Sequence, residues 1–372
     1  MMFKHGIPIG RLFGISIDLD YSWFLIVGLL AWMLAGSYFP AEYPDWGAGK
    51  YWATGIATAV MLFGSVLIHE LAHSVVAKHY GIPVPRITLF LFGGMSQIAA
   101  EPPSAGSEFW IAAVGPLTSF ALAAFFWEIE PLCRPQPALA LVSYLAWLNL
   151  MLALFNLIPG FPLDGGRIFR AIVWRATHNY HRATNAAGVA GRFFGFILIF
   201  WGVWQALAGN IGGGIWIAIV GWFLESAASS YLQQETVRTL LGGHRVLDAM
   251  QRNFVQVPGE TSLQELADRA LAPTGSRFAI VTTGGATAGM VTVGAIGQIP
   301  RENWGSTTAA QIMVPFQRLI TTQPNTVLWS ALQKMGRDGV NQMPVLDGSG
   351  VVGVLSREDV VHYLSGLRAL SA

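Results

Sequence analysis

Long apolar windows fill the first two thirds of the chain, and a mixed pattern of apolar and polar residues follows in the last third. A membrane helix needs about 20 mostly apolar residues. Six windows approach or exceed this length, at about 20–39, 53–79, 108–128, 138–158, 193–209 and 214–232. The last two are short or interrupted by glycines. The pattern predicts a polytopic α-helical membrane domain over 1–235 and a separate α/β domain over 236–372.

Two segments beside the predicted helices depart from the helical pattern. Residues 85–103, PRITLFLFGGMSQIAAEPP, are rich in strand-forming residues around a Gly-Gly pair, which predicts a membrane-level β-hairpin over about 86–99. Such backbone is not tolerated facing lipid, so the hairpin should line a cavity or face protein. Residues 156–169, NLIPGFPLDGGRIF, contain two prolines and three glycines and predict a break after the fourth window. Broken backbone at membrane depth often borders a site.

Charge supports a membrane location and gives an orientation. Only 12% of the residues are charged, against about 25% in soluble domains. Basic residues gather after the second and fourth windows, at Lys78, Arg86, Arg167, Arg170, Arg175 and Arg182. Because basic connections stay on the cytoplasmic side, this predicts both termini in the cytoplasm and a location in the inner or plasma membrane. The net charge of +1 gives no general attraction to nucleic acid, and none is expected as a partner.

The second window contains the stretch GSVLIHELAHSVVAKHY, residues 64–80. On a helix, His69 and His73 lie on one face and can bind a single tetrahedral zinc ion. Glu70 is adjacent and can act as general base on water activated by that ion. The alternative is a chance pattern of two packed histidines. A charged residue at a membrane helix centre costs about 2.5–3.5 kcal/mol on insertion scales, which metal binding would offset.

A catalytic zinc site takes three protein ligands and keeps one position open. Asp164 is the predicted third ligand, because the broken PLDGG stretch lies on the same predicted side as the C-terminal half of the second window. Taken alone, Asp164-Gly165 would indicate only a turn. Asn156 closes the fourth window, where its amide can donate to a developing oxyanion or cap the helix end. The residue chemistry leaves both roles of Asn156 open.

These motifs resemble the site-2 protease family of intramembrane zinc metalloproteases. The resemblance covers about residues 8–232 and rests on HELAH, on the N-x-x-P-x-x-P-L-D-G-G pattern of Asn156–Gly166, on FGG at Phe92–Gly94 and on GPLTS at Gly115–Ser119. It implies one zinc ion per chain, with His69, His73 and Asp164 as ligands and Glu70 as catalytic base. It also matches Asn156 to the asparagine that precedes the D-G motif. Ser119 stands where the family usually has asparagine, which leaves its role open.

Two similar segments of β-α-β-β-α order follow Leu240, about 60 to 70 residues apart. They resemble a tandem pair of CBS domains over about 244–366. The resemblance implies ATP or AMP binding and a homodimer through this pair. The family's Gly–strand–Ser/Thr–Asp pattern predicts cofactor contacts at Gly353, Ser356, Asp359 and Thr292. Ala295 replaces the aspartate in the first repeat, so at most one complete site is expected. The alternative is a packing module that binds no ligand.

The sequence therefore predicts an intramembrane zinc endopeptidase with a regulatory CBS pair. Its expected substrate is a membrane-spanning or membrane-proximal regulatory protein. The peptide must be unwound before cleavage, and the predicted hairpin offers an edge to which an extended substrate can add. The alternative is a CBS-gated metal or ion transporter that uses His69, His73 and Asp164 as a transit site. Glu70 discriminates the two, because a protease needs its carboxylate free to act on water.

Overall fold

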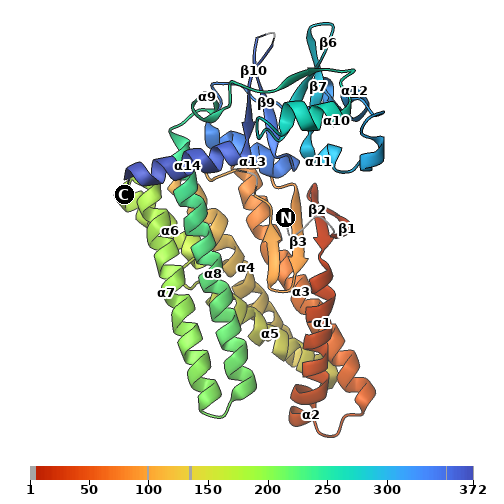
Figure 1. Cartoon of the computed structure of the whole chain (residues 1–372). Coiled ribbons are helices and arrows are strands. Elements are labelled where there is room, and N and C mark those ends of the chain that lie inside the picture. Colours follow the sequence, from red (N-terminus) through yellow and green to blue (C-terminus); the bar gives the residue numbers. More distant parts are fainter. Residues whose placement is uncertain (1–5, 99, 134–135, 349, 372) are drawn as a thin grey trace. The chain divides into compact units, whose positions relative to one another are not determined.

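The computed structural model describes residues 6–98, 100–133, 136–348 and 350–371 (Figure 1). The chain divides into two compact units, Met1–Gln233 and Gln234–Ala372. This division lies close to the boundary between residues 235 and 236 that the sequence predicts. The assignment of a separate function to each of the ranges 1–235 and 236–372 remains a prediction.

Six helices of the described chain are long and apolar enough to cross a membrane, as predicted. They are the run from α1 (Tyr21–Met33) through η1 (Leu34–Tyr38) to α2 (Phe39–Glu42), then α3 (Ala48–His79), α4 (Ala105–Ile129) with η2 (Glu130–Leu132), α5 (Gln136–Asn156), α7 (Tyr180–Leu207) and α8 (Ile211–Gly242). The last two are longer than predicted. Asn179 starts α7 early, because its side chain accepts a hydrogen bond from the amide of Arg182. Gly209, with φ of 101°, forms the turn before α8.

A four-stranded sheet packs against α3 and α4. Its order is β1 (Ile7–Leu12), β2 (Ile15–Leu19), β3 (Arg86–Phe90) and β4 (Gly93–Ser96). The pair β2–β3 is parallel and the other two pairs are antiparallel. Ile15, Ile87 and Ile111 form a buried cluster beneath it with Ala77. The two strands of the predicted hairpin are present, while its depth in a membrane stays a prediction, and its residue 99 lies outside the described residues.

The predicted break after the fourth window is present, but it is shorter than the 156–169 range. The chain is irregular from 157 to 163, and α6 (Asp164–Thr177) begins at Asp164. An acidic residue in the first turn favours a helix start, because it faces the positive end of the helix dipole. A Cβ on Gly165 or Gly166 would overlap the backbone of the loop before it. The two glycines therefore let that loop fold tightly against the start of α6.

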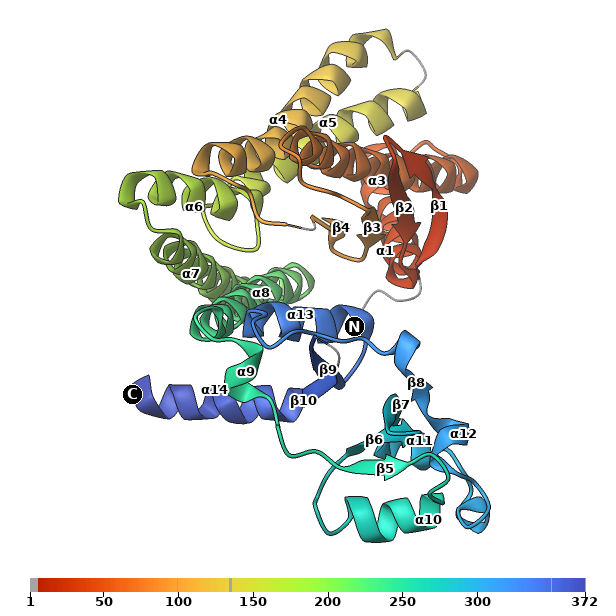
Figure 2. The ribbon, with the colours of Figure 1, turned by 90° about the horizontal axis from the view of Figure 1, so that it is seen from above.

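The second unit contains two β-hairpins, in keeping with the predicted repeat (Figure 2). One sheet has the order β5 (Gln256–Pro258), β6 (Phe278–Thr283), β7 (Ala286–Thr292) and β8 (Val314–Pro315), and the other pairs β9 (Gln342–Asp347) with β10 (Gly350–Ser356). The helical segments are α9 (Val246–Ala249), α10 (Leu263–Glu265), η3 (Leu266–Leu271), α11 (Val293–Ile296), η4 (Arg301–Asn303), α12 (Ala309–Ile312), η5 (Phe316–Arg318), α13 (Leu328–Asp338) and α14 (Arg357–Ser371). Each hairpin has its own buried apolar cluster.

Glycines allow α7 and α8 to approach closely. A Cβ on Gly202 would overlap the backbone of Ala218 and Gly214 in α8, and a Cβ on Gly195 would press against Glu225. Small residues at a helix interface permit backbone contact in membranes, where the hydrophobic effect does not drive helices together. Gly195 and Gly202 therefore let two membrane helices meet, and Gly214, one of the glycines that suggested an interruption in the sequence, lies in the same contact.

Replacing Gly202 with alanine should destabilise the chain, because overpacking costs about 1–3 kcal/mol. Gly28→Ala in α1 is the matched control, since no other atom lies within 4 Å of the position a Cβ would take there. Thermal unfolding in detergent, at one fixed scan rate, should give Gly202→Ala a midpoint several degrees below wild type. Gly28→Ala should stay at or above the wild-type midpoint. Equal midpoints for the two variants would contradict the close packing.

Candidate metal centre

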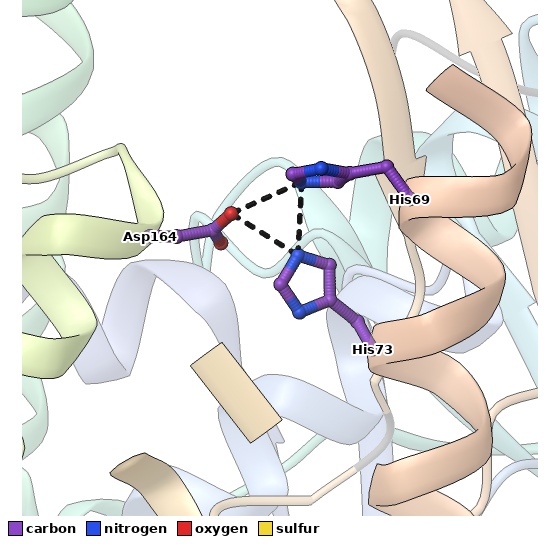
Figure 3. A group of neighbouring side chains, drawn as sticks. All are labelled: His69, His73 and Asp164. Atoms are coloured by element: carbon purple, nitrogen blue, oxygen red, sulfur yellow. Dashed lines mark hydrogen bonds and ion pairs between the residues drawn. The ribbon is translucent and has the colours of Figure 1, made fainter. Parts of the chain in front are cut away.

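Three ligand-type side chains converge in the membrane unit (Figure 3). His69 and His73 project from α3, and Asp164 comes from the first turn of α6. Asp164 Oδ2 lies 3.1 Å from Nε2 of each histidine, and the two Nε2 atoms are also 3.1 Å apart. The helix accounts for the histidine pair, because residues four apart share one face. The start of α6 at Asp164 brings in the third side chain.

The second nitrogen of each ring has a partner outside the cluster. His73 Nδ1 donates to the backbone carbonyl of Ile111 over 2.5 Å, since a carbonyl can only accept. His69 Nδ1 lies 2.9 Å from the Ser119 hydroxyl oxygen. Both contacts come from α4. A proton held on Nδ1 leaves the lone pair of Nε2 directed at the cluster, which is how metal-binding histidines are commonly oriented.

Gly115 of α4 leaves space beside the cluster. A Cβ built on this residue would overlap His73 Nε2 and would lie 2.7 Å from His69 Nε2. Tetrahedral zinc with bonds of about 2.0–2.1 Å holds its ligand atoms about 3.3 Å apart, close to the 3.1 Å triangle seen here. Two nitrogens and one carboxylate oxygen are also a usual zinc donor set. The donor chemistry, the spacing and the adjacent space fit a zinc ion.

The setting keeps Asp164 ionised. Burial acts to raise the pKa of its carboxyl, but the charge and hydrogen bonds of the His73 and His69 imidazoles, when these carry a proton on Nε2, outweigh burial and hold that pKa below its usual range. The two histidines are only 4% and 3% exposed, and the Asp164 side chain is 13% exposed. Electrostatic contacts are stronger in such a buried setting than in water. The centre therefore offers an anionic oxygen and two imidazole nitrogens with little competition from solvent.

Glu70 lies beside the edge strand β4. A Cβ on Gly94 would overlap Glu70 Cγ, so the absence of a side chain at Gly94 makes room for the carboxylate arm. Ser74, one turn further along α3, is 2.5 Å from the Ser96 hydroxyl oxygen of β4. These contacts fasten β4 to the part of α3 that carries Glu70. The carboxylate is therefore placed between the candidate metal centre on its own helix and a strand edge.

Asn156 and Ser119 make hydrogen bonds of different kinds. Asn156 Nδ2 donates to the Leu152 carbonyl of its own helix over 3.0 Å, a bond that fits the capping role. Ser119, whose role the sequence left open, contacts His69. Sequence reasoning missed the contributions of Ile111 and Gly115. Ile111 acts through its carbonyl, which no side-chain pattern reveals, whereas the GPLTS motif did contain a signal for Gly115.

In the second unit, residues of both repeats line a cavity of about 530 Å³. Of the four predicted cofactor contacts, Ser356 lines this cavity. Asp359 accepts hydrogen bonds from the amide and hydroxyl of Ser356 and from Gln251 Nε2, which places it behind two lining residues. Thr292 caps α11 through the Ala295 amide. Gly353 packs against Met250 and Gln251, where a Cβ would be within 2.9 Å of both.

Arginines give this cavity a partly basic lining. Arg252 and Arg277 line it together with Glu358. Arg277 Nη1 lies 2.9 Å from Glu358 Oε1, and both side chains are largely exposed. An exposed ion pair of this kind contributes little to stability. It can therefore open for an anionic ligand without a large loss of folding free energy.

Comparisons with known proteins agree with this organisation. A model of peptidase family M50 matches residues 57–130 and 133–201, and a CBS domain model matches residues 309–366. The protein named Rip3 of Mycobacterium tuberculosis is 34% identical over 371 residues, which are 98% of this chain and 94% of Rip3. Zinc metalloprotease MJ0392 of Methanocaldococcus jannaschii is 28% identical over 370 residues, 97% of each chain.

Among solved structures, the site-2 protease from Methanocaldococcus jannaschii is similar at a TM-score of 0.44 and 29% identity, over 61% of this chain and 95% of that one. The family follows from the sequence relatives, since the Rip3 match spans almost the full length of both proteins. This chain belongs to peptidase family M50, the site-2 protease family, as an integral membrane member with a C-terminal CBS domain.

Proposed function

We propose that the chain is an intramembrane zinc endopeptidase whose substrate is a membrane-spanning or membrane-proximal regulatory protein. The observation that carries this proposal is the buried convergence of His69 Nε2, His73 Nε2 and Asp164 Oδ2. Membership of a peptidase family supports it, and so does the name of the relative MJ0392, a zinc metalloprotease. The proposed metal content is one zinc ion per chain.

A zinc ion held by these three residues supplies a Lewis acid and lowers the pKa of water to about 7. Glu70 then acts as the general base, taking a proton from the attacking water and returning it to the leaving amine. Asn156 has two amide hydrogens, and only one is needed for its bond to Leu152. The other is proposed to donate to the developing oxyanion.

The edge of β4 is the proposed docking edge for the unwound substrate. Among the described strands, β4 is the last of its sheet and pairs only with β3. In an antiparallel ladder, alternate residues turn their backbone groups away from the partner strand. The bond from the Gln97 amide to the Arg86 carbonyl sets this alternation and turns the Gly94 groups outward. An extended peptide added there lies next to Glu70, which packs on Gly94.

The second unit is proposed to bind ATP or AMP in the cavity between its repeats and to regulate cleavage. The cavity of about 530 Å³ and the arginines Arg252 and Arg277 favour a phosphorylated ligand. Phosphate would compete with Glu358 for Arg277. The Ser356 hydroxyl, which lines the cavity, is proposed to contact phosphate. The Asp359 carboxylate, which is bonded to Gln251 and Ser356, is proposed to turn from Gln251 toward the ribose hydroxyls. The proposal also includes a homodimer formed through this unit. Both termini are proposed to lie in the cytoplasm, and the chain in the inner or plasma membrane.

The Glu70→Gln variant tests the reaction and separates it from transport. Removing the general base should lower cleavage of a membrane substrate by about 10²–10⁴-fold, while zinc content stays at wild-type level. The measurement is cleavage in detergent together with zinc content per chain. His69→Ala and Asp164→Ala are the comparison variants and should lose zinc and cleavage together. Full cleavage by Glu70→Gln would contradict the mechanism, and zinc transport across vesicles by wild type would favour the transporter.

Gly115→Ala tests the space at the metal centre. Because the new Cβ would overlap His73 Nε2, zinc affinity measured by chelator competition should fall by at least tenfold. Gly106→Ala in the same helix is the matched control, since its nearest neighbour, the Ser104 hydroxyl, is 3.9 Å from the added Cβ. Gly106→Ala should bind zinc like wild type. Unchanged affinity in Gly115→Ala would place the metal elsewhere.

Titration of the full-length chain with ATP and AMP tests the proposed cofactor. Arg277→Gln removes a charged donor and should weaken nucleotide binding by about 10–100-fold, since hydrogen bonds to charged groups contribute about 1.5–3 kcal/mol. Asp359→Ala should also weaken binding. Arg269→Gln removes another largely exposed arginine of the same repeat that does not line the cavity, and should bind like wild type. Identical isotherms for Arg277→Gln, Asp359→Ala and wild type would contradict the assignment.

A further inference from the structure

A buried ion pair joins two helices of the membrane unit. Arg170 of α6 donates from Nε to Glu108 Oε1 of α4 over 2.7 Å, and its Nη2 donates to the same oxygen. The Arg170 side chain is 3% exposed and the Glu108 side chain is fully buried. Charged residues are almost never fully buried unless they are paired. The mechanism proposed above uses neither residue, so the pair requires a separate explanation.

The guanidinium of Arg170 is held on several sides. Its Nη1 donates to the Tyr231 hydroxyl of α8 over 2.7 Å. The Phe161 and Tyr180 rings lie 5.0 and 4.9 Å from its central carbon, within cation–π distance. Burial acts to lower the pKa of Arg170, but the charge of Glu108 outweighs burial and raises it. Arg170 therefore stays charged and fixes α6 against α4 and α8.

The ion pair joins α6, which carries Asp164, to α4, which holds the imidazole of His73. On α4, Glu108 is within one turn of Ile111, whose carbonyl accepts from His73 Nδ1. On α6, Arg170 follows Asp164 along the same continuous helix. A shift of α6 along α4 would therefore change the distance between Asp164 and His73. The pair is placed where it can set this distance.

Stability alone explains the pair poorly. Replacing a buried ion pair with apolar residues of similar volume is often neutral or stabilising, whereas removing one partner costs about 3–5 kcal/mol. Glu108 Oε2 is buried and has no hydrogen-bond partner among the described residues. An ion pair that leaves one oxygen unsatisfied is not optimised for folding free energy. Fixing a unique register between packed elements is a role for which buried polar groups are known.

We propose that Glu108 and Arg170 are positioning residues, which set the separation of Asp164 from His73 and so control zinc affinity. This inference rests on the zinc centre proposed above. Neither side chain touches the ligand atoms. They act through α4, which holds the imidazole of His73, and through α6, which carries the carboxylate of Asp164.

Zinc affinity and thermal stability of the full chain in detergent test this role. The variants are Glu108→Gln, Arg170→Lys and the apolar double variant Glu108→Leu/Arg170→Met. Each should weaken zinc binding by about tenfold or more, the range seen when groups that orient metal ligands are removed. Without metal, the thermal unfolding midpoint of the double variant should lie within a few degrees of the wild-type midpoint. Arg192→Gln is the control, because it breaks the 3.3 Å ion pair of Arg192 with Glu225 away from the ligands.

The outcomes separate this inference from the proposed function. If the double variant is stable and binds zinc like wild type, the ion pair has only a packing role and the inference is wrong. If the single variants fail to fold, the double variant still decides. If wild type binds no zinc, the proposed metal centre and this inference are both wrong. Arg192→Gln should bind zinc with wild-type affinity. A tenfold loss of zinc affinity in this control would show that the effect is not specific to the Glu108–Arg170 pair and would contradict the inference.

Discussion

Two imidazoles and a carboxylate are buried among apolar helices, and this burial constrains the rest of the membrane unit. A polar group without a partner in such a setting costs several kcal/mol. The ring nitrogens of His69 and His73 that face away from the cluster are satisfied by a hydroxyl and a carbonyl of α4. Their other nitrogens face each other and Asp164 at 3.1 Å. Only a shared proton or a cation can satisfy lone pairs this close, and zinc matches the chemistry of these three atoms.

The helix α4 serves the centre through three kinds of group. The Ser119 hydroxyl and the Ile111 carbonyl orient the two rings, and Gly115 leaves the space beside them. Pro116 follows Gly115 inside this continuous helix and has no amide hydrogen to donate to the preceding turn. The GPLTS motif therefore contributes three features to this helix: the absent side chain of Gly115, the absent amide hydrogen of Pro116 and the hydroxyl of Ser119.

Sequence periodicity was sufficient for the six membrane helices and for the pairing of His69 with His73, because both depend on local helical geometry. The third group, Asp164, required two breaks in the apolar pattern at one predicted membrane depth, and the family resemblance then implied the same ligand. The strands β1 and β2 were not predicted, since both are short and their partner β3 lies far along the chain. The pairing of Glu108 with Arg170 was also invisible, because α4 and α6 meet only in the fold and Arg170 resembled a basic topology signal.

The candidate site is built from helices on one side and from a strand edge on the other. The metal ligands come from helices, whose side chains are held by packing, whereas the proposed peptide edge belongs to a short strand. Gly94 and Gly115 both lack side chains, one beside Glu70 and the other beside the histidines. A side chain at either position would overlap the Glu70 side chain or the histidine rings. Because the two glycines create space locally, the surrounding apolar helices can still pack closely.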